Sequence, residues 1–67
     1  MRIDRVRFAT ALARADLNVN QLAEKAGVSR GTVTAVRTGK SCRKETADRL
    51  AAAMGVDTAE LIEEVTR

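Results

Sequence analysis

The sequence predicts an all-α protein, built as one domain of five short helices over residues 1–67. Three observations predict this class. The chain is rich in alanine and other helix-forming residues and contains no proline. Apolar side chains recur at intervals of three and four residues, as they do along one face of a helix. Glycines and short polar residues separate these apolar stripes, at the points where helices end and begin.

The first two predicted helices are separated by a short polar break. Residues 3–15 carry a wide apolar stripe, in which Phe8 and Leu12 lie one helical turn apart. We expect this face to pack on the rest of the domain. The stripe then stops, and Asn18 is a residue type that caps a helix, here a second helix over Val19–Ala26.

A tight turn separates the second helix from the third. Gly27 is its natural pivot, because glycine tolerates the positive φ that such corners often need. Ser29 can cap the third helix, which we predict over Arg30–Thr38. Val33 and Val36 share one face of it and must point back at the second helix. The two helices together form a helix-turn-helix.

Two further helices are predicted after Gly39, which has the position of a helix-ending glycine. The fourth covers Lys44–Met54 and ends at Gly55. The fifth begins after Asp57, because Asp57-Thr58-Ala59-Glu60 has the form of an acidic capping box. The apolar positions are Ala47, Leu50, Ala51 and Met54 on the fourth helix, and Leu61, Ile62 and Val65 on the fifth.

Positive and negative charges occupy different parts of the chain. Residues 30–44 hold five cations and no acid, a formal charge of +5. Residues 45–67 hold six acids against two arginines, a formal charge of −4. A charged run by itself is often only a solvated surface. This basic run coincides with the outer face of the third helix and the loop after it, which favours contacts with phosphate groups.

A helix of this kind fits the major groove of DNA, and residues near its N-terminus reach the base edges. Arg30 is the main candidate, because a guanidinium can bind guanine O6 and N7 together; a phosphate contact or simple solvation is the alternative. Gly31 either allows the backbone to approach DNA closely or is merely tolerated. Thr34 can touch a thymine methyl group or donate a hydrogen bond, and Ala35 can add apolar contact.

A second set of side chains is expected to contact the phosphate backbone. Its cations follow the base-reading segment along the chain. Its two asparagines lie near the start of the second helix, where the helix dipole favours an anion, although capping is the stronger interpretation for Asn18. The set comprises Asn18, Asn20, Ser29, Thr32, Arg37, Thr38, Lys40, Arg43 and Lys44.

These residues carry a resemblance to a known family. The stretch LNVNQLAEKAGVSRGTVTAVRTGK resembles the Cro/C1-type helix-turn-helix family, also called the XRE family, of small phage and bacterial regulators. The later stretch RLAAAMGVDTAELIEE resembles it more loosely. The resemblance covers most of the chain. It implies a lambda-repressor-like domain that binds double-stranded DNA and regulates transcription, as a repressor.

The sequence departs from this family at three positions. Val19 stands where members commonly carry a glutamine that binds phosphate. Leu12 and Arg37 stand where many members pair an arginine with a glutamate. Because both partners are replaced, no buried charge is left alone, and Arg37 is free to face DNA. The departures concern the phosphate clamp and leave the fold unaffected.

A domain of this size covers little DNA, so we expect a homodimer on a pseudo-palindrome with half-sites about 34 Å apart. Its dimer surface is expected at the C-terminal part, where the apolar residues exceed what a small core needs. In an alternative reading, an antitoxin or anti-regulator-like module of this fold binds a protein partner through its acidic C-terminal helix. The residues assigned to the dimer interface are Val56, Leu61, Ile62 and Val65.

Other function classes find little support. The chain has no histidine, and Cys42 has no evident base beside it, so we expect no enzyme, no metal site and no cofactor. Arg43 and Lys44 can lower the pKa of the Cys42 thiol and make it redox-sensitive, or Cys42 is an ordinary loop residue. Without a membrane-spanning run or a signal peptide, a cytoplasmic, nucleoid-associated protein is expected.

Overall fold

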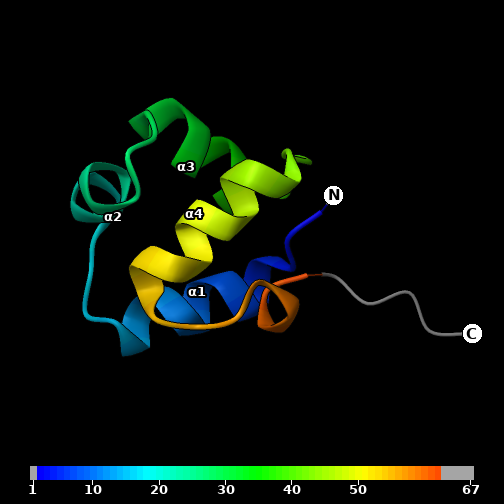
Figure 1. Ribbon diagram of the computed structural model, residues 1–67, viewed down its shortest axis with the longest axis horizontal. Helices are drawn as coiled ribbons and strands as arrows, with labels where there is room; N and C mark the ends of the chain where they lie inside the picture. Colours follow the sequence, from blue (N-terminus) through cyan, green and yellow to red (C-terminus); the bar gives the residue numbers. More distant parts are fainter. Residues whose placement is uncertain (1, 63–67) are drawn as a thin grey trace, which may run out of the picture.

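The computed structural model describes residues 2–62, and in this range it contains four α-helices (Figure 1). Helix α1 spans Arg5–Arg14, α2 spans Val19–Ala26, α3 spans Arg30–Arg37 and α4 spans Lys44–Met54. A single 3₁₀ turn, η1, follows at Thr58–Glu60. The predicted all-α class is confirmed, and α2 and α4 have the predicted bounds.

Local side chains fix the starts of the first two helices. The Asp4 carboxylate caps α1 and accepts the backbone N–H groups of Val6 at 2.8 Å and Arg7 at 3.1 Å. Asn18 caps α2 as predicted, because its Oδ1 accepts the N–H of Gln21 at 2.7 Å. Gln21 Oε1 accepts the N–H of Asn18 in return, at 3.0 Å. This reciprocal pair satisfies two backbone donors that would otherwise be unpaired.

Gly27 forms the corner between α2 and α3. Its φ of 73° lies in the left-handed region, which a side chain at this position would make unfavourable. The N–H groups of Gly27 and Val28 both donate to the carbonyl of Ala23, at 2.9 and 3.0 Å, so that α2 ends here. The predicted helix-turn-helix is therefore present.

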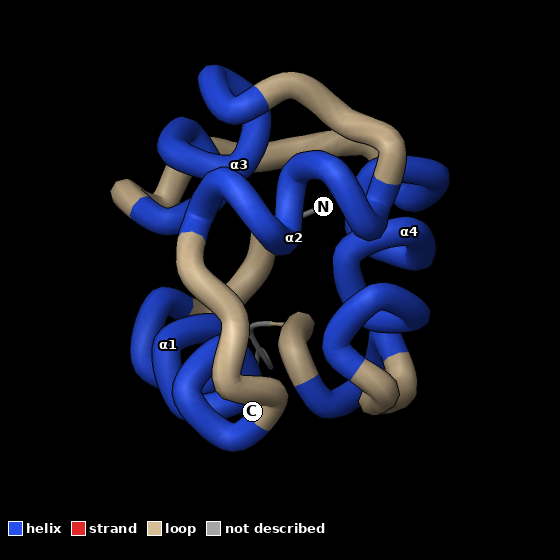
Figure 2. Tube along the Cα trace, turned by 90° about the vertical axis from the view of Figure 1, so that its left-hand side faces the viewer, coloured by secondary structure: helices blue, strands red, loops and turns tan. Residues whose placement is uncertain are grey.

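Helix α2 lies at the centre of the packing. It contacts both α3 and α4, and Figure 2 shows it in front, between these two helices. Helix α1 closes the other side of the core through its contact with α3. The predicted apolar face of α4 is confirmed, since all four of its residues are buried. The largest fully buried side chains are Phe8, Leu22, Val33, Val36, Leu50 and Leu61.

The predicted fifth helix is not confirmed. The start of the predicted element has the expected cap, because the N–H of Asp57 donates to Glu60 Oε2 at 3.2 Å. Within the described residues, however, only the 3₁₀ turn Thr58–Glu60 follows it. Val65 and the remainder of the predicted helix lie outside the described residues.

Pairing with the start of the chain explains this difference. The carbonyl of Leu61 accepts the N–H of Asp4 at 2.8 Å, and Ile62 forms an antiparallel bridge with Ile3. A residue in such a bridge has extended backbone, so Ile62 itself does not continue a helix. The N-terminal segment therefore pairs with the residues that follow η1. The side chain of Leu61 is buried there, with 1% of its surface exposed.

One side chain ties α4 to the 3₁₀ turn. The Thr58 hydroxyl donates to Asp48 Oδ1 at 2.6 Å, and Lys44 Nζ lies 3.3 Å from Asp48 Oδ2. Two hydrogen bonds lower the pKa of the Asp48 carboxyl. The bond from Thr58 has the larger effect, and the bond from Lys44 comes second. A group with a lowered folded-state pKa stabilises the fold above its unfolded pKa, and this contribution is lost as the pH falls through the folded pKa.

Replacing Asp48→Asn should lower the stability of the fold at pH 7, because the charged acceptor of both bonds is lost. The difference from the wild type should shrink as the pH falls through the lowered pKa of the folded Asp48 carboxyl, because the carboxyl is then protonated in both the folded and the unfolded chain. Urea unfolding, monitored by circular dichroism at pH 7 and at pH 3, measures the stability difference at each pH. Glu24→Gln, which removes an exposed carboxylate from α2, is the control. An equal difference at both pH values would contradict the assignment.

Candidate nucleic-acid interface

Helix α3 turns one face to the core and the other to solvent. Val33 and Val36 are 0% and 1% exposed, so their burial fixes the orientation of the helix. The residues predicted to read bases lie on the outer side: Arg30, Gly31 and Thr34 are exposed and Ala35 is half-buried. The structure therefore brings these four residues to one surface, with Ala35 at its edge.

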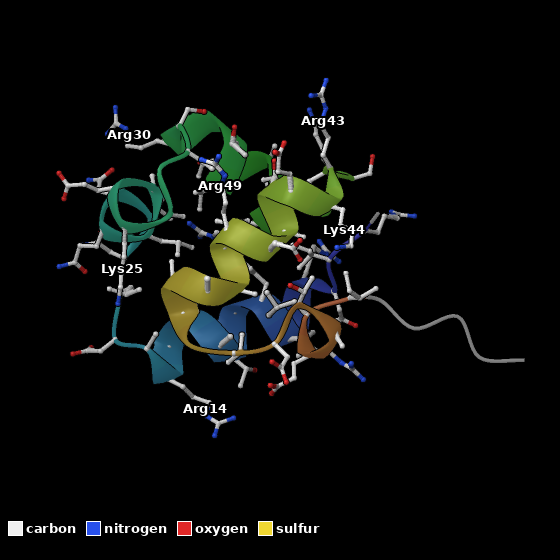
Figure 3. The ribbon with its side chains drawn as sticks, viewed as in Figure 1. Arg14, Lys25, Arg30, Arg43, Lys44 and Arg49 are labelled. Atoms are coloured by element: carbon white, nitrogen blue, oxygen red, sulfur yellow. The ribbon has the colours of Figure 1, made fainter. Side chains whose placement is uncertain are left out.

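Arg30 is held at the start of this surface by α2. Its Nη1 donates to Oδ1 of Asn20 at 3.1 Å, which joins the first turn of α3 to the first turn of α2. A guanidinium has five N–H donors, so four remain for another molecule. Figure 3 shows Arg30 directed outward from the start of α3. A contact with a phosphate group was predicted for Asn20 from the sequence, whereas its hydrogen bond to Arg30 was not predicted.

Several of the predicted phosphate ligands are engaged in caps. Ser29 Oγ accepts the N–H of Thr32 at 3.1 Å and lies 2.9 Å from the Thr32 hydroxyl, so one of the two hydroxyls still has a hydrogen to donate. The Thr38 hydroxyl donates to the carbonyl of Ala35 at 2.9 Å. Asn18 caps α2 through Oδ1, which leaves its amide nitrogen as a donor.

The loop after α3 supplies exposed cations. Lys40 and Arg43 are exposed, and Arg43 precedes α4 without a capping bond from its side chain. Lys44 is paired with Asp48 across one turn of α4, at 3.3 Å. An exposed pair of this kind is weak, so Lys44 can exchange Asp48 for another anion. Figure 3 shows Arg43 and Lys44 at the beginning of α4.

Arg37 lies beside the start of α2. A surface hollow of about 430 Å³ is lined by Leu12, Asn18, Val19 and Arg37, among others. The two positions where the sequence departs from the charged pair of the family, Leu12 and Arg37, are therefore neighbours in space. Arg37 is exposed, and among the described residues it has no hydrogen-bonded or ionic partner.

Two further arginines near this surface could not be found from sequence patterns. Nη1 of Arg49 lies 3.6 Å from the position that a Cβ would take at Gly27, and Figure 3 shows Arg49 reaching from α4 toward the turn. There its charge stabilises the C-terminal end of α2. Arg5, at the start of α1, lies against Gly39 after α3. Neither placement has a signal in local sequence, because both join segments far apart in the chain.

The residues assigned to a dimer interface divide into different environments. Leu61 is 1% exposed and belongs to the core of its own domain, so its assignment to an outer surface is corrected. Val56 is partly buried against the same core, and Ile62 is half-buried beside Ile3. Val65 lies outside the described residues. The prediction counted Leu61 among apolar residues that the core does not need, whereas Leu61 fills part of that core.

The expected effect of neighbouring cations on Cys42 is also corrected. The thiol is half-buried, and this burial raises its pKa rather than lowering it. A raised thiol pKa reduces the thiolate fraction, which is the reactive form. Cys42 packs as a partly buried apolar residue against the core.

The described residues show neither a metal site nor a membrane helix. Residues 2–62 contain no group of three or more His, Cys, Asp or Glu side chains that could hold a metal ion. Within the same range, no helix combines the length and the apolar character that crossing a membrane requires.

The fold and this surface define a helix-turn-helix domain, and comparison with known families agrees. The family model of the Cro/C1-type helix-turn-helix DNA-binding domain matches residues 7–66. The chain therefore belongs to this family, and it is a DNA-binding domain of the kind found in regulators. A comparison with curated proteins found no match.

Two solved structures share the fold. They are PhpD with cadmium complexed with hydroethylphosphonate, and native PhpD with cadmium atoms. Each matches with a TM-score of 0.82 and 24% identity over the whole of this chain. The chain spans 15% of the length of the PhpD chain. At this identity the likeness concerns the backbone fold alone.

The burial of Cys42 predicts slow reaction with thiol reagents. In the folded protein its alkylation by iodoacetamide at pH 7.5 should be slower than that of the urea-unfolded chain, because access and the thiolate fraction are both reduced. The rate should rise with pH through a midpoint above that of the unfolded control. Mass spectrometry of timed samples measures it. A lower midpoint in the folded protein would restore the redox-sensitive alternative.

Proposed function

We propose that this protein is a sequence-specific regulator of transcription, acting as a repressor, that inserts α3 into the major groove of double-stranded DNA. The observation that carries the proposal is the first turn of α3, where Asn20 holds Arg30 at the solvent surface with four donors open. Side chains at the start of such a helix are the ones that meet base edges. A guanidinium held in place can bind guanine O6 and N7 together.

Gly31 is consistent with a close approach by DNA. A Cβ at this position would meet only Ser29 Oγ, at an ordinary contact distance of 3.8 Å. The interior of the domain therefore gives no reason for glycine in the middle of this turn, where it weakens the helix by up to about 1 kcal/mol relative to alanine. Close contact between the backbone and a base pair is the reason we propose, with Thr34 and Ala35 beside it.

Phosphate contacts on both sides of α3 would orient the helix. On one side, Arg37 and the amide of Asn18 border the same hollow at the start of α2. Arg37 takes over there, in our proposal, the phosphate contact that Val19 cannot make. On the other side, Lys40, Arg43 and Lys44 follow α3. Contacts of this type fix the register of a protein on the duplex and carry most of the salt dependence.

We further propose that two copies bind a pseudo-palindrome, in the cytoplasm. One small module covers roughly 600–1,000 Å² of its surface on DNA, which limits its affinity. The described chain ends toward one end of the long axis, while α3 lies along the top of the view (Figure 1). A partner bound at that end through Ile62, in our proposal, would leave α3 open to DNA.

A second candidate is a module that binds a protein partner, as antitoxins or anti-regulators of this fold do. One observation favours it. Val6 is 74% exposed, and a hollow of about 330 Å³ beside it is lined by α1 and by Val56, Glu60 and Leu61. Replacing both Arg30 and Arg37 by alanine would abolish DNA binding under the first proposal and leave partner capture intact under the second.

Selection from a pool of random duplexes at about 0.15 M salt tests the first proposal, because non-specific phosphate attraction is partly screened there. We expect a palindromic motif. Arg30→Ala should weaken binding to it by about 1–3 kcal/mol and relax the preference at one base pair in each half-site. Lys25→Ala, which removes a cation near the end of α2, should change neither the affinity for the motif nor the base preference. Retention without enrichment, or no retention, would contradict the proposal.

The dimer surface has its own test. Ile62→Glu should give a monomer, because it places a charge in the proposed contact, and its apparent affinity for a palindrome should fall toward that for a single half-site. Sedimentation and circular dichroism report size and folding. A folded variant that stays dimeric would place the interface elsewhere. Leu61→Glu is unsuitable for this purpose because Leu61 lies in the core.

A further inference from the structure

The first residues of the chain are fixed against the end of the domain. Ile3 is 3% exposed and forms an antiparallel bridge with Ile62. The backbone of Asp4 donates to the carbonyl of Leu61 at 2.8 Å, and its carboxylate caps α1. Arg5, which follows at once, therefore begins from a fixed backbone position.

Arg5 lies against the loop that follows α3. A Cβ at Gly39 would come within 3.2 Å of Arg5 Cδ, which is tighter than most Cβ contacts, and would lie at an ordinary 3.7 Å from Arg5 Cγ. Gly39 also has a φ of 98°, which disfavours a side chain there. Glycine at this position thus leaves room for the aliphatic part of Arg5. With that part held, the guanidinium loses less rotamer freedom when it binds a partner.

The surroundings of Arg5 are positively charged. One hollow of about 340 Å³ is lined by Arg5, Arg2, Thr38 and Gly39, and an adjoining one of about 480 Å³ by Arg2, Gly39, Lys40 and Ser41. The acid that lines the first hollow, Asp4, uses its carboxylate at the start of α1. The three cations thus surround the loop at the C-terminal end of α3.

We infer that Arg5 binds a backbone phosphate of DNA next to the phosphate reached by Lys40. The inference rests on the proposed DNA binding and extends its contact surface to the N-terminal segment. A duplex presents about one negative charge per 1.7 Å of its axis, so a strand passing Lys40 offers further phosphates within reach. A guanidinium binds phosphate oxygens with two parallel hydrogen bonds.

The salt dependence of DNA binding tests this inference. Arg5→Gln and Arg14→Gln remove the same charge from the two ends of α1, and Figure 3 shows Arg14 at the end of the molecule away from α3. For Arg5→Gln the slope of log K against log salt should become shallower by about 0.9 for each bound copy, and the affinities for the selected and an unrelated duplex should fall by the same factor. Arg14→Gln should leave the slope unchanged, and Arg5→Lys should restore it.

Equal slopes for Arg5→Gln and Arg14→Gln would overturn the inference, because only net charge would then matter. Loss confined to the selected duplex would also overturn it, since it would make Arg5 a base reader. Thermal unfolding checks the fold, and Arg5→Met, which keeps the aliphatic length, replaces Arg5→Gln if that variant unfolds. If Lys40→Gln reduces the slope and Arg5→Gln does not, this inference alone fails. If the wild type binds no duplex, the proposed function fails as well.

Discussion

The burial of Val33 and Val36 against the rest of the domain is the constraint on which the surface depends. Because an α-helix repeats every 3.6 residues, fixing these two side chains inside leaves Arg30, Gly31 and Thr34 outside. The turn at Gly27 sets how α2 meets α3, and it thereby brings Asn20 within hydrogen-bond distance of Arg30. The packing of the core thus determines which side chains of α3 lie at the candidate interface.

Features decided within four residues could be predicted from the sequence. The cap at Asn18, the cap at Ser29 and the left-handed turn at Gly27 each depend on a residue type and its immediate neighbours. The inward faces of α3 and α4 follow from the spacing of apolar residues alone. These features define the helix-turn-helix and the side of α3 that faces solvent, which is the larger part of the fold.

Features decided by contacts between distant segments could not be predicted. A capping pattern correctly marked Asp57 and Glu60, but the conformation of the next two residues depends on their pairing with Ile3 and Asp4 at the start of the chain. The same holds for the candidate site. The bond between Arg30 and Asn20 spans ten positions, and the contact between Arg5 and Gly39 spans about half of the chain. Residue types at the surface were foreseeable, whereas their partners were not.

The likeness to PhpD separates what the fold determines from what the surface determines. A backbone is shared at 24% identity with a segment that makes up 15% of a longer chain. Such agreement requires inward residues of compatible size, and it places no condition on outward ones. Leu12 and Arg37 illustrate the difference, because they are neighbours that replace a charged pair common in the family. An apolar partner leaves Arg37 without a bond among the described residues and hence available to an anion from outside. Under the proposed function, the choice among DNA sequences therefore depends on exposed arginines and asparagines rather than on the helices that carry them.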